Sequence, residues 1–336
     1  MKNFYFIRLF IAILLFGSQI SFVSAQTRFK SLNFLYSISG IKTVAGIHNR
    51  EPNNNPSLWT DSITVLSGKT PGLWSGDFLF SKNDVEQRWK MIYEAEDSWN
   101  KGSLVNLMWH CCSPLHGEPC HWDGEGVLDK MSDQDWLSLI KEGDPLNLVW
   151  KSRLDDIATY LKYLESKNVK VLFRPFHEMN QPVFWWAGRK GINGTVKLYQ
   201  ITHDYLTKTK GLKNLIWLWD LQDFNTLVTD LIDYNPGSEY WDVLALDMYG
   251  SDGTNYTIEK YNAIVKTAGR KPIAIGECQV LPTPTILKSQ PKWTFFMSWA
   301  ELTVKHNTKA AIVGLYQESN VITLDEMQGW NNKVQK

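Results

Sequence analysis

Eight short runs of apolar and β-branched residues recur along this chain, and their alternation with longer segments is the feature that most constrains its fold. Three of those segments carry apolar residues at helical spacing: Leu146–Lys167, Asn193–Thr209 and Ile258–Ala268. Strands that alternate with helices over about 290 residues predict an α/β fold of the (β/α)8 TIM-barrel type, with a doubly wound sheet as the alternative. The eight runs are Lys42–Ile47, Gly72–Asp77, Leu104–Trp109, Lys170–Arg174, Leu215–Trp219, Val243–Asp247, Pro272–Gly276 and Trp293–Trp299.

The alternative is less favoured because no glycine-rich dinucleotide motif follows the first run; Gly40 and Gly46 lack the required spacing. No Pro-, Gly- or Ser-rich linker divides the chain, so we predict one domain over residues 26–336. Residues 1–25 have the basic start, the apolar run and the small residues of a secretory signal peptide, with cleavage after Ala25. We therefore expect a secreted or periplasmic protein without a membrane span in the mature chain.

The charge balance narrows the possible ligands. The 35 Lys and Arg residues equal the 35 Asp and Glu residues in number, which argues against broad electrostatic binding of nucleic acid. The chain also holds 16 Trp residues, more than core packing usually needs. Either the core is rich in Trp, or a cleft stacks flat and partly apolar ligands such as sugar rings.

Polar residues follow the predicted strands, and in a TIM barrel the carboxyl ends of the strands form the active-site face. The clearest polar segments after a predicted strand start at Arg174 and at Gly276. Polar or aromatic residues also end three other predicted strands, at Trp109-His110, at Asp247-Met248-Tyr249 and at Asp77. Together these ends predict one polar cleft.

Two of these strand ends carry glutamates, Glu178 and Glu277, on the fourth and seventh predicted strands. Hydrolysis of a glycosidic bond needs one protonated carboxyl group for the leaving oxygen and one ionised carboxylate at the anomeric carbon. Arg174 would hold a nearby carboxylate ionised, and an apolar wall of Trp185 and Trp186 would raise the pKa of the acid. A single glutamate at a strand end is more often a salt-bridge partner, so the argument depends on the pair.

In these motifs the sequence resembles glycoside hydrolase family 26, the β-mannanase family. The resemblance rests on the segments 109–110, 174–180, 184–186, 247–249, 275–277, 296–299 and 316–323, and it covers roughly residues 40–327. It implies a retaining endo-β-1,4-mannanase acting on mannan, glucomannan or galactomannan, with Glu178 as acid/base and Glu277 as nucleophile. It implies substrate or carboxyl contacts for His110, Arg174, His177, Trp185, Trp186, Tyr249 and Trp299, and neither a metal nor a cofactor.

The chain departs from the family pattern at Val183, where many relatives carry an aromatic residue, and at Cys278 beside the proposed nucleophile. Hydrolysis of mixed-linkage β-glucan or β-1,3-xylan, and release of mannobiose from chain ends, remain alternatives within the family. A carbohydrate-binding protein without catalysis is an alternative of another class.

The four cysteines, Cys111, Cys112, Cys120 and Cys278, allow three full pairings, and the sequence does not choose among them. A local disulfide or free thiols are favoured over a metal site built from His110, Cys111, Cys120 and His121, whose spacing matches no tight ligand pattern. Among the Trp residues, we expect Trp109, Trp185, Trp186 and Trp299 to contact sugar rings.

Overall fold

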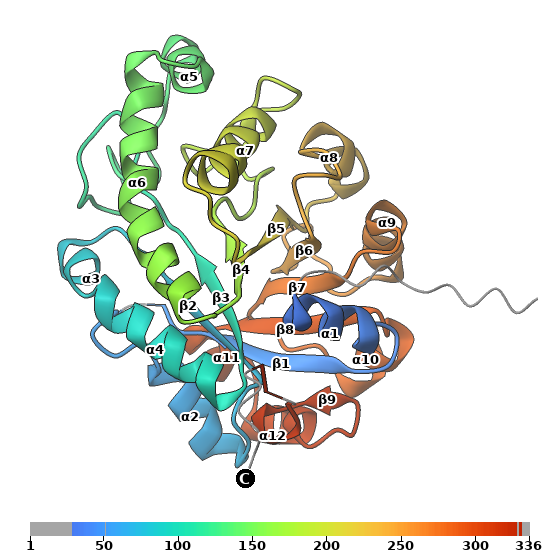
Figure 1. Ribbon diagram of the computed structural model, residues 1–336. Coiled ribbons are helices and arrows are strands. Elements are labelled where there is room, and N and C mark those ends of the chain that lie inside the picture. Colours follow the sequence, from blue (N-terminus) through green and yellow to red (C-terminus); the bar gives the residue numbers. More distant parts are fainter. Residues whose placement is uncertain (1–28, 51, 328, 331–336) are drawn as a thin grey trace, which may run out of the picture.

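Eight parallel strands close into a barrel in the computed structural model, which describes residues 29–50, 52–327, 329 and 330 (Figure 1). Strand β1 pairs with both β2 and β8, which closes the ring, and the short β9 pairs with the first two residues of β1, Thr43 and Val44. The strands are β1 (Thr43–His48), β2 (Leu73–Asp77), β3 (Leu104–Met108), β4 (Val171–Arg174), β5 (Leu215–Gln222), β6 (Val243–Met248), β7 (Ile273–Cys278), β8 (Trp293–Trp299) and β9 (Val321–Ile322). The prediction of a (β/α)8 barrel is confirmed.

Helices connect successive strands and surround the barrel (Figure 1). They are α1 (Lys30–Ile38), α2 (Leu58–Ser67), α3 (Lys82–Glu86), α4 (Arg88–Lys101), α5 (Asp133–Ile140), α6 (Pro145–Ser166), α7 (Thr195–Asp204), the π-helical η1 (Tyr205–Thr209), α8 (Leu227–Asp233), α9 (Ile258–Ala268), α10 (Pro284–Ser289), α11 (Ala300–His306), α12 (Lys309–Tyr316) and the 3-10 turn η2 (Leu324–Glu326). In the described part of the chain, no helix is both long and apolar enough to cross a bilayer. The predicted signal peptide lies outside the described residues.

Strand β5 departs most from the sequence prediction, because it continues three residues past Trp219 to Gln222. Asp220 and Gln222 are polar, but both are buried where β5 reaches the active-site face. The predicted helix over 193–209 is divided into α7 and η1. Strand β9 was not predicted, since two residues carry too little pattern to be recognised.

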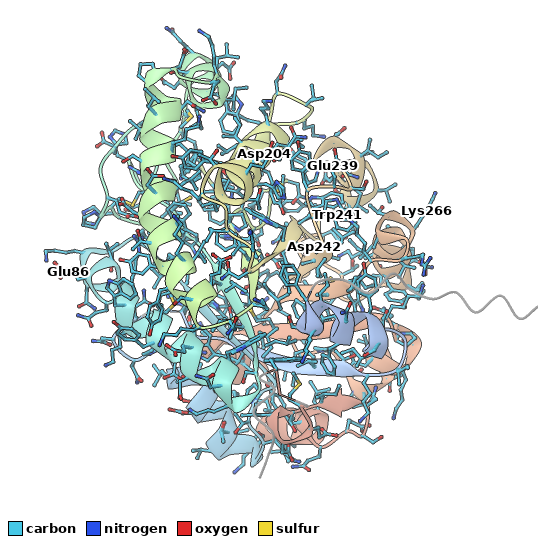
Figure 2. All side chains as sticks on the ribbon, in the orientation of Figure 1. Glu86, Asp204, Glu239, Trp241, Asp242 and Lys266 are labelled. Carbon is cyan, nitrogen blue, oxygen red and sulfur yellow. A yellow bond between two sulfur atoms is a disulfide. The ribbon has the colours of Figure 1, made fainter. Side chains whose placement is uncertain are left out.

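Most Trp residues pack inside the protein. Trp74, Trp109, Trp150, Trp186, Trp219 and Trp293 are at most 1% exposed. Side chains fill the space between the ribbons in Figure 2, where Trp241 and Asp242 are labelled. They precede β6 on the face opposite the active-site face, and the ammonium of Lys271 lies 3.9 Å from the ring centre of Trp241. The Trp excess is therefore largely structural.

Candidate active site

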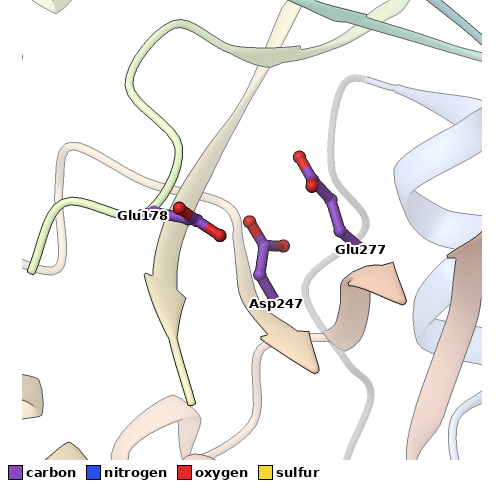
Figure 3. A group of neighbouring side chains, drawn as sticks. All are labelled: Glu178, Asp247 and Glu277. Atoms are coloured by element: carbon purple, nitrogen blue, oxygen red, sulfur yellow. The ribbon is translucent and has the colours of Figure 1, made fainter. Parts of the chain in front are cut away.

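Three carboxyl groups converge at the carboxyl ends of the strands (Figure 3). Glu178 follows β4, Asp247 lies in β6 and Glu277 lies in β7, and one oxygen of each lies within 4.8 Å of the others. All three residues are buried. The sequence prediction that strands four and seven bring two glutamates together thus agrees with the geometry, and Asp247 joins them.

The Arg174 guanidinium lies at the centre of this group and is fully buried. Its Nη1 donates to Asp220 at 2.7 Å and to both oxygens of Asp247, at 2.9 and 3.0 Å, while Nη2 donates to Glu277. Arg174 therefore orients carboxyl groups and has no surface for sugar hydroxyls. Three carboxylates could in principle hold a divalent ion, but the guanidinium already pairs with two of them.

Two backbone features allow this crowding. A Cβ on Gly276 would lie 2.4 Å from an oxygen of Asp220 and 2.5 Å from one of Asp247, so only glycine lets β7 pass beneath these side chains. Glu178 has a φ of 48°, an unfavourable conformation for a residue with a side chain. Its N–H donates to Asp220 Oδ1 at 3.1 Å, which holds the strained turn in place.

The surroundings of Glu178 and Glu277 differ in how far they stabilise the ionised carboxylate. Burial raises the pKa of Glu178 well above its usual range, and the negative charges of Glu277 and Asp220 add to that rise. Burial also raises the pKa of Glu277, but the Arg174 charge and the Tyr249 hydroxyl oppose this. Glu277 accepts hydrogen bonds from Arg174 and Tyr249, whereas among the described residues Arg174 donates none to Glu178. The surroundings therefore favour the ionised form at Glu277 and the protonated form at Glu178.

Tyr249, just after β6, donates from its hydroxyl to Glu277 Oε2 at 2.7 Å. Burial and the Glu277 charge raise the pKa of Tyr249 well above its usual value, so it stays protonated and able to donate. The loop beyond Tyr249 is fixed by Asp223, whose carboxylate accepts the N–H groups of Gly250 and Ser251 and pairs with Lys260. Tyr249 thus approaches Glu277 from an anchored loop.

Two histidines adjoin the carboxyl groups, with ring centres 4.3 Å apart. His110 Nδ1 contacts Asp77; burial alone would raise the pKa of Asp77, but the charge and hydrogen bond of His110 bring it down to about 2. Burial, and next the His110 charge, lower the pKa of His177 well below its usual value, so this ring is neutral. Its Nδ1 is buried without a hydrogen-bond partner among the described residues.

A cleft of about 470 Å³ opens beside His110. Trp299, at the end of β8, stacks on His48 with ring centres 4.3 Å apart, and burial lowers the pKa of His48 to about 3, so an uncharged imidazole supports the indole. Across the cleft lies Trp122, which is 44% exposed. The residues that line the cleft are Arg50, Leu79, Phe80, His110, Trp122 and Trp299.

The loop that carries Trp122 is held by several strong contacts. A disulfide joins Cys112 to Cys120, and Arg88 forms a two-pronged ion pair with Glu118, at 2.7 and 2.8 Å. Arg153 donates to the carbonyl oxygens of Cys112 and His116. Trp122 is therefore presented from a rigid segment.

The prediction that Trp109, Trp185 and Trp186 contact sugar rings is wrong, because their exposed fractions are 0, 2 and 0%. Trp109 stacks on Trp150 in the core, and the indole N–H of Trp185 donates to the carbonyl of Cys111. Trp186 donates to the carbonyl of His177 at 3.1 Å, so it supports the loop that carries Glu178.

The structure agrees with the favoured cysteine hypotheses, because Cys112 and Cys120 form a local disulfide and Cys111 and Cys278 are free thiols. Cys120 is held in the disulfide and cannot ligate a metal as a thiolate, which removes the site proposed from His110, Cys111, Cys120 and His121. Cys278 is a free, buried thiol, so it does not link the nucleophile strand to another cysteine.

Sequence reasoning missed several residues of this site: His48, Asp220, Gln222 and Trp122. His48 and Gln222 end β1 and β5, and the strand-end argument applied to the correct boundaries would have found them. Trp122 lies in a long loop and has no comparable signal.

Comparisons with known proteins place these features in context. The glycosyl hydrolase family 26 model matches residues 23–326. The mannan endo-1,4-beta-mannosidase of Thermothelomyces thermophilus is 31% identical over 311 residues, covering 89% of this chain and 61% of that protein. This chain therefore spans about three-fifths of the length of that curated relative.

Two solved structures match this chain over most of the length of both chains. GH26A from a Muricauda species is 36% identical with a TM-score of 0.83, and the match covers 89% of this chain and 96% of that one. A beta-mannanase from a symbiotic protist of the termite Reticulitermes speratus, complexed with gluco-manno-oligosaccharide, is 27% identical with a TM-score of 0.76, covering 88% and 93%.

Proposed function

This chain belongs to glycosyl hydrolase family 26, and from that premise we propose that it is an exported endo-acting hydrolase of β-1,4-mannosidic bonds that retains anomeric configuration. The observation that carries the proposal is the close approach of Glu178 and Glu277, whose nearest oxygens lie within 4.8 Å. Inverting glycosidases separate their carboxyl groups by about 6.5–9.5 Å to admit a water, and retaining ones by only about 5–5.5 Å.

In the first step, Glu277 attacks the anomeric carbon while Glu178 gives its proton to the departing glycosidic oxygen. The geometry suits these roles, because Arg174 and Tyr249 direct their donors at Glu277 and hold one lone pair free for attack. Glu178 lies in a buried, negatively charged surrounding that keeps it protonated until the leaving oxygen accepts the proton.

In the second step, the same groups release the covalent glycosyl-enzyme. Glu178, now ionised, removes a proton from water, the water oxygen bonds to the anomeric carbon, and Glu277 departs as a carboxylate. The departing carboxylate regains its full ion pair with Arg174, which favours its departure. The proton taken from water restores Glu178 for the next cycle.

Trp299 and Trp122 supply aromatic surface to a neutral polysaccharide, and His110 and His177 supply polar contacts beside the carboxyl pair. The names of the relatives, which specify mannan and a gluco-manno-oligosaccharide, support mannan or glucomannan as the substrate. We further propose that residues 1–25 are removed on export and that residues 26–336 form the catalytic unit; amino-terminal sequencing of the exported protein should begin at Gln26.

The test is product analysis on mannan, mixed-linkage β-glucan, β-1,3-xylan and defined mannooligosaccharides. We expect internal cleavage of mannan with β-anomeric products, and loss of activity by at least about 10³-fold in Glu277→Ala. Glu239→Ala is the matched control, since Glu239 is exposed and precedes β6 on the opposite face. Cleavage of glucan or xylan alone would refute the substrate, mannobiose as the sole initial product would refute endo action, and full activity in Glu277→Ala would refute the mechanism.

A further inference from the structure

Gln222, the last residue of β5, lies between the proposed acid/base and the loop that carries Tyr249. With its amide nitrogen directed at Glu178, that nitrogen donates to Glu178 Oε1 at 2.7 Å and to the main-chain carbonyl of Asp247 at 3.3 Å. The amide oxygen then accepts the Ser251 hydroxyl at 2.7 Å. All hydrogen-bonding groups of this amide face the active site or its supporting loop.

The Asp247 carbonyl determines which way the Gln222 amide points. A hydroxyl such as that of Ser251 donates or accepts, so it tolerates both orientations, whereas a carbonyl oxygen only accepts. The reversed amide would place its oxygen against the carbonyl oxygen of Asp247, so two acceptors would face each other in place of a hydrogen bond. The amide nitrogen is therefore held on the side of Glu178.

Asn180 fixes the backbone of Gln222 against the loop that carries Glu178. The Asn180 side chain accepts the N–H of Gln222 at 2.7 Å and donates to its carbonyl at 3.0 Å, and it also donates to Asp230. Asn180, two residues after Glu178, thus ties the backbone of Gln222 to the loop that carries Glu178. The two partners of the Gln222–Glu178 hydrogen bond are therefore held in a fixed relative position.

We propose that Gln222 is a positioning residue that assigns the proton of Glu178 to Oε2, the oxygen left to meet the glycosidic oxygen; this inference rests on the proposed hydrolase function. A protonated carboxyl group has one carbonyl oxygen and one hydroxyl oxygen. Because an N–H group directed at Oε1 favours an unprotonated oxygen there, the proton resides on Oε2. If the amide were reversed, its oxygen would accept a proton from Oε1 and withdraw it from the substrate.

The same hydrogen bond also acts after proton transfer. An N–H donor stabilises a carboxylate more than a neutral acid, so Gln222 offsets part of the rise in pKa that burial imposes on Glu178. Other charged or titratable groups that act on Glu178 come from β4, β5, β6, β7 and the loop after β6: Arg174, Asp220, Asp247, Glu277 and Tyr249. The side chain of Gln181 also hydrogen-bonds Glu178 and lowers its pKa. Substitution of Gln222 leaves all of these groups in place.

The experiment compares two substrates and two variants. Gln222→Met removes the donor without adding charge, and Gln222→Glu replaces the amide nitrogen by an oxygen of the same size. We expect both variants to lower kcat/KM about 10- to 100-fold on β-1,4-mannotetraose, whose leaving group needs protonation. On 2,4-dinitrophenyl β-mannobioside, whose leaving group needs none, kcat/KM should stay within about twofold of the wild type, as it should in a Glu178→Ala reference.

The pH dependence supplies a second readout that a merely structural role would not move. Loss of the donor destabilises the Glu178 carboxylate, so the alkaline limb of kcat/KM for Gln222→Met should shift upward by about one pH unit. An unmoved alkaline limb, or equal losses on both substrates, would overturn the assignment. If the wild-type protein cleaves neither substrate, the proposed function itself fails, and the two failures are thereby distinguished.

Discussion

The buried ion-pair cluster around Arg174 gives the prediction that depends most directly on the geometry. Replacement of Arg174 by Met keeps the approximate shape of the side chain and removes its charge. Asp220, Asp247 and Glu277, which are at most 3% exposed, would then face one another without a cation. Removal of one partner from a buried pair typically costs about 3–5 kcal/mol of unfolding free energy, and we expect a loss of that size near neutral pH.

The loss should depend on pH in a defined direction. Burial raises the folded-state pKa values of Asp247 and Glu277, and the Arg174 charge opposes that rise. Without Arg174, both pKa values therefore rise further above their unfolded values of about 4. A group with a raised folded-state pKa contributes stability that is present below its unfolded pKa and is lost as the pH rises through its folded pKa. The difference between wild type and Arg174→Met should therefore be smaller at about pH 5 than at about pH 7, by about 1 kcal/mol or more.

Urea denaturation at the two pH values measures both quantities. Arg189→Met is the control, since the Asp133 side chain that Arg189 contacts is 93% exposed; its cost should stay below about 1 kcal/mol at both pH values. Arg174→Lys restores a charge and should recover part of the stability. An Arg174→Met loss below about 1 kcal/mol, or one that does not change between the two pH values, would refute the reasoning.

Three further predictions follow from single contacts. Gly276→Ala should lower the unfolding free energy by several kcal/mol in urea denaturation, because its Cβ would lie 2.4 Å from a carboxylate oxygen of Asp220; an unchanged midpoint would contradict the crowding. Tyr249→Phe should lower kcat about 10- to 100-fold with little change in KM, since its hydroxyl orients Glu277; a change in KM alone would place it in substrate binding instead. Cys120→Ser should cost about 2–3 kcal/mol of unfolding free energy, the chain-entropy value for the short loop that the disulfide closes, and a reducing agent should lower the wild type to the same stability.

The barrel was predictable from the sequence because its signal is repeated. Each of the eight runs is a weak strand signal by itself, yet the runs recur along the chain with longer segments between them. The run Trp293–Trp299 matches β8 at both ends. The pairing of Cys112 with Cys120 was not predictable, since it depends on a loop path that leaves their Cα atoms 5.9 Å apart. The sequence contains no periodicity that encodes such a path.

The site was predictable where chemistry coincides with a strand end, as for Glu178 and Glu277. Asp220 was not predicted as a site residue, because a charged residue directly after Trp219 indicates the start of a loop. The four residues from Trp219 to Gln222 in fact alternate apolar and polar, the pattern of a strand whose polar face reaches a buried cluster. Burial of such polar side chains is possible only because Arg174 lies on the neighbouring strand, and single-strand patterns carry no information about that neighbour.

The Trp residues failed as predictors of ring contacts for a related reason. Their rings serve both packing and stacking, and position along a strand does not separate the two uses. Trp185 and Trp186 lie next to the catalytic loop in sequence, but their indole N–H groups donate to main-chain carbonyls and their rings are buried. The ring surfaces that reach the cleft come instead from a strand end, Trp299, and from the disulfide-closed loop region, Trp122.

The charge count at the site explains why two similar glutamates take different roles. Four carboxyl groups, those of Glu178, Asp220, Asp247 and Glu277, share the single buried cation of Arg174, and full ionisation would leave three uncompensated charges in a low-dielectric interior. At least one proton must therefore be retained, and Glu178, to which the guanidinium offers no hydrogen bond among the described residues, is the favoured place for it. Gln222 then determines which oxygen carries that proton. The proposed division between acid and nucleophile thus rests on the position of one arginine, and the proposed direction of proton delivery rests on one amide.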